Sequence, residues 1–264
     1  MGDFTADWLA LREAADARSR DRGLLRLLET WAPERSGLSV LDLGCGSGAN
    51  LRALAPYLGV GQRWTAVDHD PALLARLPAQ LSGAGWSATL ETRCADLGGF
   101  DWPAADLVTA SALLDLVSER WLEDLIRRHP GAPFYFALSI DGRVELAPPH
   151  AADGPVLDAF AADLRGSKGL GQALGGEAPA RAEDLLREAG YQVATAASDW
   201  NLGREDAALA EAWLSGVTAA GEVQKQVEKS VVTNWLSSRL EDLEEGRLGL
   251  RVGHRDLLAL PLSG

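Results

Sequence analysis

The feature that most constrains the fold is a short apolar run that leads directly into a glycine turn, within residues 39–50. Val40, Leu41 and Leu43 are bounded by turn residues, as expected for a strand buried on both faces of a parallel sheet. Glycines then follow at positions 44, 46 and 48. Glycine permits backbone conformations that a Cβ atom forbids, and it lets a ligand approach the main chain closely. Apolar residues recur at helical spacing from about Ala49 to Gly59, so the stretch predicts a strand, a glycine turn and a helix in succession.

Two kinds of cofactor site are compatible with this turn. Gly44, Gly46 and Ala49 satisfy the GxGxxG/A fingerprint of dinucleotide sites, which leaves a nicotinamide-dependent oxidoreductase as an alternative function. Asp42, at the tip of the strand, argues against it, because a pyrophosphate on these amides would meet that negative charge at close range. A ligand with an ammonium group would be attracted instead.

Residues 42–48, Asp-Leu-Gly-Cys-Gly-Ser-Gly, resemble the first motif of the class I S-adenosylmethionine-dependent methyltransferases, an acidic residue followed by GxGxG. The resemblance is specific over residues 38–140 and only topological thereafter. It implies a Rossmann-like α/β fold, with a mostly parallel seven-stranded sheet whose last strand is antiparallel and helices on both faces. It also implies S-adenosylmethionine as cofactor, with Asp42 near its methionine moiety, the glycines beneath it and an N-terminal helix folded over it.

Further cofactor-binding candidates follow the other predicted strands. Asp68 ends the second strand, about 20 residues beyond the turn, where a carboxylate accepts hydrogen bonds from ribose hydroxyls in either kind of site. The resemblance assigns Asp96, just past the third strand, to the adenine amino group. The predicted cofactor-binding residues are Asp42, Gly44, Cys45, Gly46, Gly48, Asp68, His69, Asp96, Leu97 and Ser111.

Strands and helices alternate from Leu38 onward, which predicts a parallel sheet covered on both faces. We expect an N-terminal helical segment over residues 1–37 and a methyltransferase domain over residues 38–264. Within that domain, strand five is predicted to end near Ile140, and the Gly- and Pro-rich residues 147–178 to form an insertion that is either a lid, which would select the substrate, or a long surface loop. Residues 206–245 are predicted to be a long helical insertion, and residues 249–260 a hairpin turning at Gly253 and His254.

Two titratable side chains in the expected crevice are candidate catalytic groups. Methyl transfer is an in-line displacement that depends mainly on holding nucleophile and methyl group close and aligned. Asp115 follows strand four, and His150, which titrates near neutral pH, opens the insertion. Residues 111–117 lack the Asn/Asp-Pro-Pro-aromatic motif that nucleic-acid and protein-glutamine amino methyltransferases usually carry there. This absence favours an oxygen, carbon or other small-molecule acceptor.

The amino-acid composition limits which kinds of partner the chain can bind. The chain has 25 basic and 38 acidic residues, for a formal charge of −13, so phosphate backbones would be repelled. Cys45 and Cys94 are too few for a disulfide framework or a cysteine zinc site, and no apolar run approaches the roughly 18 residues of a membrane span. Asp3 and Asp7 stand where a signal peptide would be basic. We therefore expect a cytoplasmic protein with a small-molecule methyl acceptor and without nucleic-acid, metal or membrane partners; a non-catalytic S-adenosylmethionine-binding protein is a further alternative.

Overall fold

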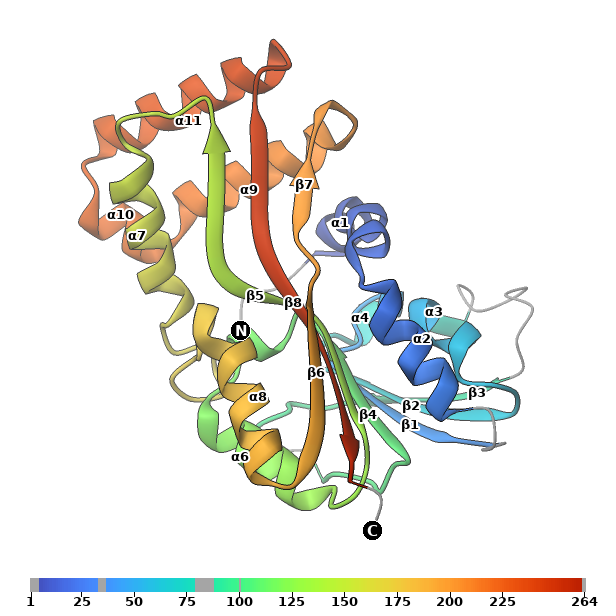
Figure 1. Ribbon diagram of the computed structural model, residues 1–264. Helices are drawn as coiled ribbons and strands as arrows, with labels where there is room; N and C mark the ends of the chain where they lie inside the picture. Colours follow the sequence, from blue (N-terminus) through green and yellow to red (C-terminus); the bar gives the residue numbers. More distant parts are fainter. Residues whose placement is uncertain (1–4, 33–36, 79–87, 100, 263–264) are drawn as a thin grey trace.

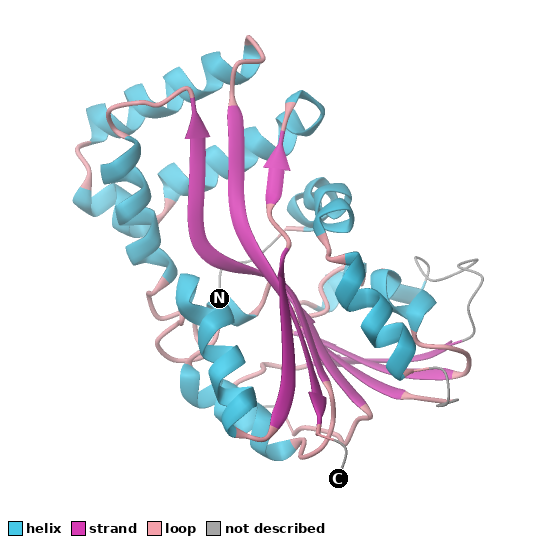
Figure 2. Ribbon diagram, in the orientation of Figure 1, coloured by secondary structure: helices cyan, strands magenta, loops and turns pink. Residues whose placement is uncertain are grey.

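The computed structural model describes residues 5–32, 37–78, 88–99 and 101–262. Within these residues the chain forms an eight-stranded sheet in the order β3-β2-β1-β4-β5-β8-β6, with β7 paired to β8 (Figures 1 and 2). Strands β1 to β5 run parallel, whereas β8 runs antiparallel to β5, β6 and β7. The strands are β1 Ser39–Leu43, β2 Gln62–Asp68, β3 Ala88–Cys94, β4 Leu107–Ser111, β5 Phe134–Ala147, β6 Tyr191–Ala197, β7 Trp200–Leu202 and β8 Gly249–Pro261. The expected mostly parallel sheet with an antiparallel last strand is confirmed.

Helices cover both faces of the parallel part of the sheet. On one face, α2 (Arg22–Trp31) and α3 (Ala49–Leu54) pack with β1 through one core, to which Val40 belongs. On the other face, α6 (Glu119–Arg128) and α8 (Ala178–Glu188) pack through a second core that contains Leu41 and Leu43. Neighbouring residues of a strand point to opposite faces, so the continuous apolar run of β1 reflects burial on both sides. Helix α4 (Pro71–Leu74) follows β2, and the short 3-10 helix η1 (Ala55–Tyr57) extends α3.

Strands β5 and β8 continue far beyond the parallel sheet, which the sequence analysis did not predict. β5 runs to Ala147 instead of ending near Ile140, and β8 is one continuous strand. The predicted hairpin at Gly253 and His254 is therefore wrong. A Cβ atom on Gly253 would lie 2.8 Å from Cβ of Arg143 and would overlap the carboxylate of Asp141. This glycine allows β5 and β8 to approach closely and does not form a turn.

A second layer of helices packs on this extension of β5, β7 and β8, as Figure 1 shows. It consists of α7 (Asp153–Leu164), α9 (Ala207–Ala219), α10 (Gly221–Gln226) and α11 (Lys229–Glu244). The 3-10 helix η3 (Gly175–Glu177) precedes α8, and η4 (Arg204–Asp206) precedes α9. The predicted long helical region thus forms three helices, α9, α10 and α11. None of the described helices is both long and apolar enough to cross a membrane.

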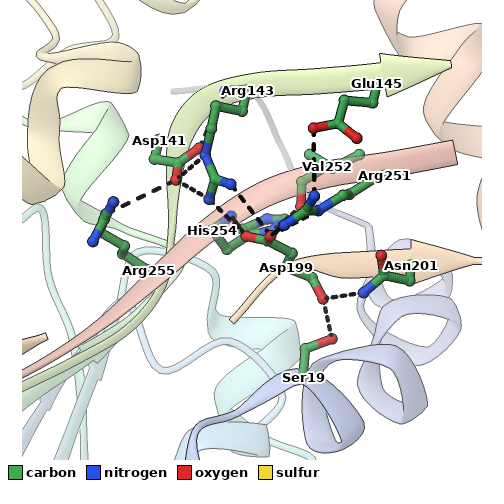
Figure 3. Close-up of polar contacts among 10 residues, drawn as sticks. All are labelled: Ser19, Asp141, Arg143, Glu145, Asp199, Asn201, Arg251, Val252, His254 and Arg255. Atoms are coloured by element: carbon green, nitrogen blue, oxygen red, sulfur yellow. Dashed lines mark hydrogen bonds and ion pairs between the residues drawn. The ribbon is translucent and has the colours of Figure 1, made fainter. Parts of the chain in front are cut away.

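Asp199, between β6 and β7, joins the elements that meet where the extension begins (Figure 3). Its carboxylate accepts hydrogen bonds from Arg143 Nη2 of β5 at 2.8 Å and from Arg251 Nε of β8 at 2.8 Å. The backbone N–H of His254 donates to the same carboxylate at 3.0 Å. Ser19, the last residue of α1 (Ala6–Ser19), donates through Oγ to the backbone carbonyl of Asp199 at 3.0 Å. Helix α1 is therefore fixed to the start of the extension.

The predicted lid segment is packed against the body of the protein. Leu170 and Ala173 are buried. The backbone N–H of Ser118 donates to the carbonyl of Leu170 at 3.3 Å, and that of Leu174 donates to the carbonyl of Val117 at 2.9 Å. Movement of this segment as a lid stays a prediction.

Arg239 of α11 links this helix to the start of α7 within the second layer. Its side chain is fully buried, and it donates to the carbonyl of Pro148 and to Oδ2 of Asp153, each at 2.6 Å. We expect Arg239→Met to lower the free energy of unfolding by about 3 kcal/mol, because it leaves the Asp153 carboxylate without its counter-charge. Urea unfolding would measure this loss. The control Arg187→Met removes a largely exposed pair with Glu183 and should change stability by about 0.5 kcal/mol or less. Equal losses in both variants would contradict the structural role of Arg239.

Candidate cofactor and catalytic site

A cavity of about 100 Å³ lies at the carboxyl ends of β1, β2 and β4, beneath α1. In open α/β sheets this edge is where ligands bind. The cavity is lined by the glycine turn, by the residues that follow β2 and by those that follow β4. Of the predicted cofactor-binding residues, the structure brings to it Gly44, Cys45, Gly46, Asp68, His69 and Ser111.

The glycine turn has the left-handed backbone that its sequence predicts. Gly44, Gly46 and Gly48 have φ angles of +62°, +51° and +81°. The backbone N–H of Gly46 donates to Oδ2 of Asp68 at 2.8 Å, which ties the turn to the end of β2. Gly48 does not line the cavity; a Cβ atom there would overlap the side chain of Leu77, so this glycine allows close packing.

Asp68 is held in place by backbone hydrogen bonds, but its carboxylate can still accept hydrogen bonds from a ligand. Its Oδ1 accepts a hydrogen bond from the backbone N–H of Asp70 at 3.0 Å, while Oδ2 accepts from Gly46. His69 Nδ1 lies 3.3 Å from the same Oδ1. An ionised carboxylate has about four lone-pair sites, so Asp68 can still accept from hydroxyls placed in the cavity.

Asp42 lies beneath the glycine turn and does not line the cavity. It is fully buried, and Nδ2 of Asn50 donates to its Oδ1 at 2.7 Å. Within the described chain its Oδ2 has no hydrogen-bond partner. Burial raises the pKa of Asp42 to about 7, although the Asn50 hydrogen bond and the charge of Arg20 oppose this rise. A positively charged group near Oδ2 would favour the ionised form.

Arg20, which the sequence analysis did not single out, extends from the end of α1 to the same place. It is buried, and its Nη2 donates to Oγ of Ser111 at 3.1 Å. In the described part of the chain, neither Nη1 of Arg20 nor Oδ1 of Asn50 has a hydrogen-bond partner. Buried polar groups are rarely left unpaired, so these atoms together with Oδ2 of Asp42 fit a ligand that carries both an ammonium and a carboxylate. The one signal in the sequence is the cluster of arginines at positions 12, 18, 20 and 22 in an acidic chain.

Helix α1 closes the cavity with Leu9, Arg12 and Asp16. Arg12 Nε donates to Oδ2 of Asp16 at 2.8 Å, and Nε1 of the buried Trp200 donates to Oδ1 of Asp16 at 2.9 Å. Trp200 thus helps to anchor α1. A volume of about 100 Å³ is below the roughly 300 Å³ of small-molecule pockets, so we expect lining side chains to move when a nucleoside enters.

Besides Asp42 and Gly48, four predicted site residues do not line this cavity: Asp96, Leu97, His150 and Asp115. Asp96 Oδ1 accepts from the backbone N–H of Gly98 at 2.8 Å, and Leu97 is buried in the core. His150 follows Ala147, the last residue of β5. At 3.3 Å per residue, Ala147 lies roughly 20 Å along the strand from Asp141. There its Nδ1 accepts from the backbone N–H of Ala152. The structure therefore does not support a catalytic role for His150, because β5 is longer than expected.

Asp115 remains close to the site, in the 3-10 helix η2 (Leu114–Leu116) after β4. It is buried, and no described residue forms a hydrogen bond to its Oδ1. Burial raises the pKa of Asp115 to about 6, partly offset by a hydrogen bond to its own backbone and by the charges of Arg12 and Lys168. Before η2, Ala112 lines the cavity with a φ of +51°. Such strain in a non-glycine residue is typical of functional sites.

Comparisons with known proteins agree with this fold. Residues 40–129 match a family model described as a methyltransferase domain. No curated protein matches the chain. Among solved structures, the YcgJ protein from Bacillus subtilis has 16% sequence identity and a TM-score of 0.52, covering 92% of this chain and 100% of its own. The cyclopropane synthase MmaA2 from Mycobacterium tuberculosis has 12% identity and a TM-score of 0.53, covering 97% and 95%. At these identities the two structures show a shared fold.

Proposed function

We propose that the chain is a class I S-adenosylmethionine-dependent methyltransferase that methylates a small molecule, in agreement with its matched methyltransferase domain and its fold. The observation that carries this proposal is the set of unpaired buried atoms beside the glycine turn: Oδ2 of Asp42, Oδ1 of Asn50 and Nη1 of Arg20. They match the ammonium and carboxylate of the cofactor's methionine moiety. A small acceptor is supported by residues 111–117, which lack the Asn/Asp-Pro-Pro-aromatic motif of nucleic-acid and protein-glutamine amino methyltransferases.

Each side chain has a distinct proposed role. Asn50, which lines the cavity, would hold the ammonium with the charge of the buried Asp42 beneath it, while Arg20 would hold the carboxylate and Asp68 the ribose hydroxyls. The cofactor supplies a methyl group that is electrophilic because it is bonded to a sulfonium. Asp115, with a pKa of about 6, is mostly ionised at pH 7 and would accept a proton from the acceptor.

Calorimetry and a transfer assay test this function. We expect S-adenosylmethionine and its demethylated product to bind, and a nicotinamide dinucleotide not to bind. Incubation with methyl-labelled cofactor and a small-molecule filtrate of a cell extract should then yield a labelled small molecule. Binding of the dinucleotide alone would overturn the assignment. Cofactor binding without labelled product from any extract would indicate a non-catalytic binding protein.

Asp68 provides a separate test of the cofactor site. Asp68→Ala is expected to weaken S-adenosylmethionine binding by roughly 1.5 to 3 kcal/mol, the magnitude for hydrogen bonds to a charged group. Asp68→Asn keeps an acceptor for the Gly46 N–H and should weaken binding less. Calorimetry would measure both affinities. A loss below about 0.5 kcal/mol in the alanine variant would place the ribose contact elsewhere.

A further inference from the structure

A second cavity, of about 530 Å³, lies between α7 and β5 where the extension of the sheet begins. Its volume is within the roughly 300 to 1,000 Å³ of small-molecule sites. One wall is apolar and is formed by Ile140, Val144, Leu157, Phe160 and Leu164. We call this cavity the α7–β5 groove.

The polar rim of the groove carries more negative than positive charge. It contains the carboxylates of Asp141, Asp158 and Glu177, against the guanidinium groups of Arg143 and Arg165. Arg143 is already paired with Asp141 and with Asp199 (Figure 3). Asp158 and Glu177 are exposed and form no ion pair with any described residue. The groove therefore offers an apolar wall next to carboxylates that can attract a cation.

The 3-10 helix η2 contacts elements that line this groove and also contributes to the lining of the cofactor cavity. Leu116 of η2, together with Leu113 just before it, lines the cofactor cavity. η2 also contacts β5 and η3, and these two elements supply Ile140 and Glu177 to the groove. The buried carboxylate of Asp115 belongs to this partition. The groove and the cofactor cavity are therefore linked through η2.

We propose that the α7–β5 groove binds the methyl acceptor, and that this acceptor is a small molecule with an apolar body and a cationic group. The apolar body contacts Leu157, Phe160 and Leu164, and the cationic group lies near Asp158 and Glu177. This proposal rests on the proposed methyltransferase function. The proposal does not specify which atom is methylated. It is compatible with the missing Asn/Asp-Pro-Pro-aromatic motif, because the groove would recognise the acceptor by charge and apolar contact.

Charge reversal at two exposed positions tests the groove without disturbing the core. The double variant Asp158→Lys/Glu177→Lys should bind octyltrimethylammonium at least about five-fold more weakly than the original chain, in calorimetry at low ionic strength. Octanoate, the anionic counterpart, should bind the variant more tightly than it binds the original chain. Asp184→Lys/Glu211→Lys makes the same change of charge on exposed residues that do not line the groove, and it should leave both affinities unchanged.

Two further measurements distinguish failure of the groove proposal from failure of the methyltransferase function on which it rests. The double variant should keep its affinity for S-adenosylmethionine, and the small molecule labelled by the original chain should be retained by a cation-exchange resin. If S-adenosylmethionine does not bind the original chain, the proposed function fails. If it binds but octyltrimethylammonium does not, or if the labelled product is anionic, only the groove proposal is overturned. An equal loss of probe binding in the control variant would also overturn it.

Discussion

Gly46→Val is expected to abolish measurable binding of S-adenosylmethionine, with at least about a 100-fold loss of affinity. Gly46 has a φ of +51°, which a β-branched residue adopts only at a cost of roughly 1 to 3 kcal/mol. Its Cβ would also lie 3.1 Å from Cδ1 of Leu9, so the side chain would extend into the space between the turn and α1. That space is part of the cofactor cavity. Calorimetry on a variant shown to be folded by circular dichroism would measure the loss.

Gly131→Val is the matched control for backbone strain. Gly131 has a similar φ of +77° and lies in the turn between α6 and β5. A Cβ atom added to Gly131 would point into open space, with no described atom within 4 Å apart from its chain neighbours. This variant should lose a comparable amount of stability and should bind S-adenosylmethionine normally. Unchanged affinity in a folded Gly46→Val variant would show that the cofactor does not pass over this turn.

The centre of the fold could be predicted because its information is local in the sequence. The apolar run of β1, the glycines and the start of α3 lie within about a dozen consecutive residues. The carboxyl ends of parallel strands meet at one edge, so Asp68 and Ser111 could also be placed near the turn once the strands were recognised. Their positions required no knowledge of side-chain packing.

The extension of the sheet was missed because strand five was predicted to end near Ile140 and Gly253 was interpreted as part of a turn. Beyond Ile140 the chain alternates Arg143 and Glu145 with Val144 and Leu146, a strand pattern with one buried face. Gly142 has a φ of +82° and coincides with a register shift between β5 and β8, and the pairing resumes after it. Gly253 sits within a continuous strand. The sequence alone does not separate a bulge or a close approach from a turn.

The remaining part of the site depends on contacts between distant residues. Arg20 and Ser111 are 91 positions apart, and Asp16 and Trp200 are 184 positions apart. No local pattern indicates that α1 closes the cavity or that Arg20 reaches the end of β4. The resemblance implied a helix over the cofactor, but it could not identify which arginine points inward.

Asp42→Asn is expected to stabilise the protein at alkaline pH. Burial raises the pKa of Asp42 to about 7 in the folded chain, from 3.8 in the unfolded chain. The folded state therefore binds more protons than the unfolded state between these values, so Asp42 causes stability to fall as pH rises from about 4 to about 7. Asparagine does not ionise and removes this loss. At 1.36 kcal/mol for each pKa unit, the difference in unfolding free energy between variant and original chain should grow by up to about 4 kcal/mol from pH 4 to pH 8.

Urea unfolding at several pH values would measure this gain. Asp184→Asn, on an exposed position of α8, should show no comparable gain at pH 8. A difference between Asp42→Asn and the original chain that does not change with pH would show that Asp42 titrates without perturbation in the folded protein.

The same substitution should weaken cofactor binding, because a neutral amide cannot offset the ammonium of S-adenosylmethionine. In the original chain the ligand must bind to the ionised form of Asp42, so its affinity should rise with pH by up to about tenfold per unit below pH 7 and level off above it. In the variant the affinity should be lower at pH 8 and nearly independent of pH between 5 and 7. Calorimetry in buffers of different ionisation enthalpy would also show proton release on binding near pH 6 in the original chain alone. If a steep pH dependence of the affinity persists in Asp42→Asn, the titrating group is another residue. If the pH dependence disappears and the variant is more stable, the buried carboxylate of Asp42 is retained for ligand binding at the expense of stability.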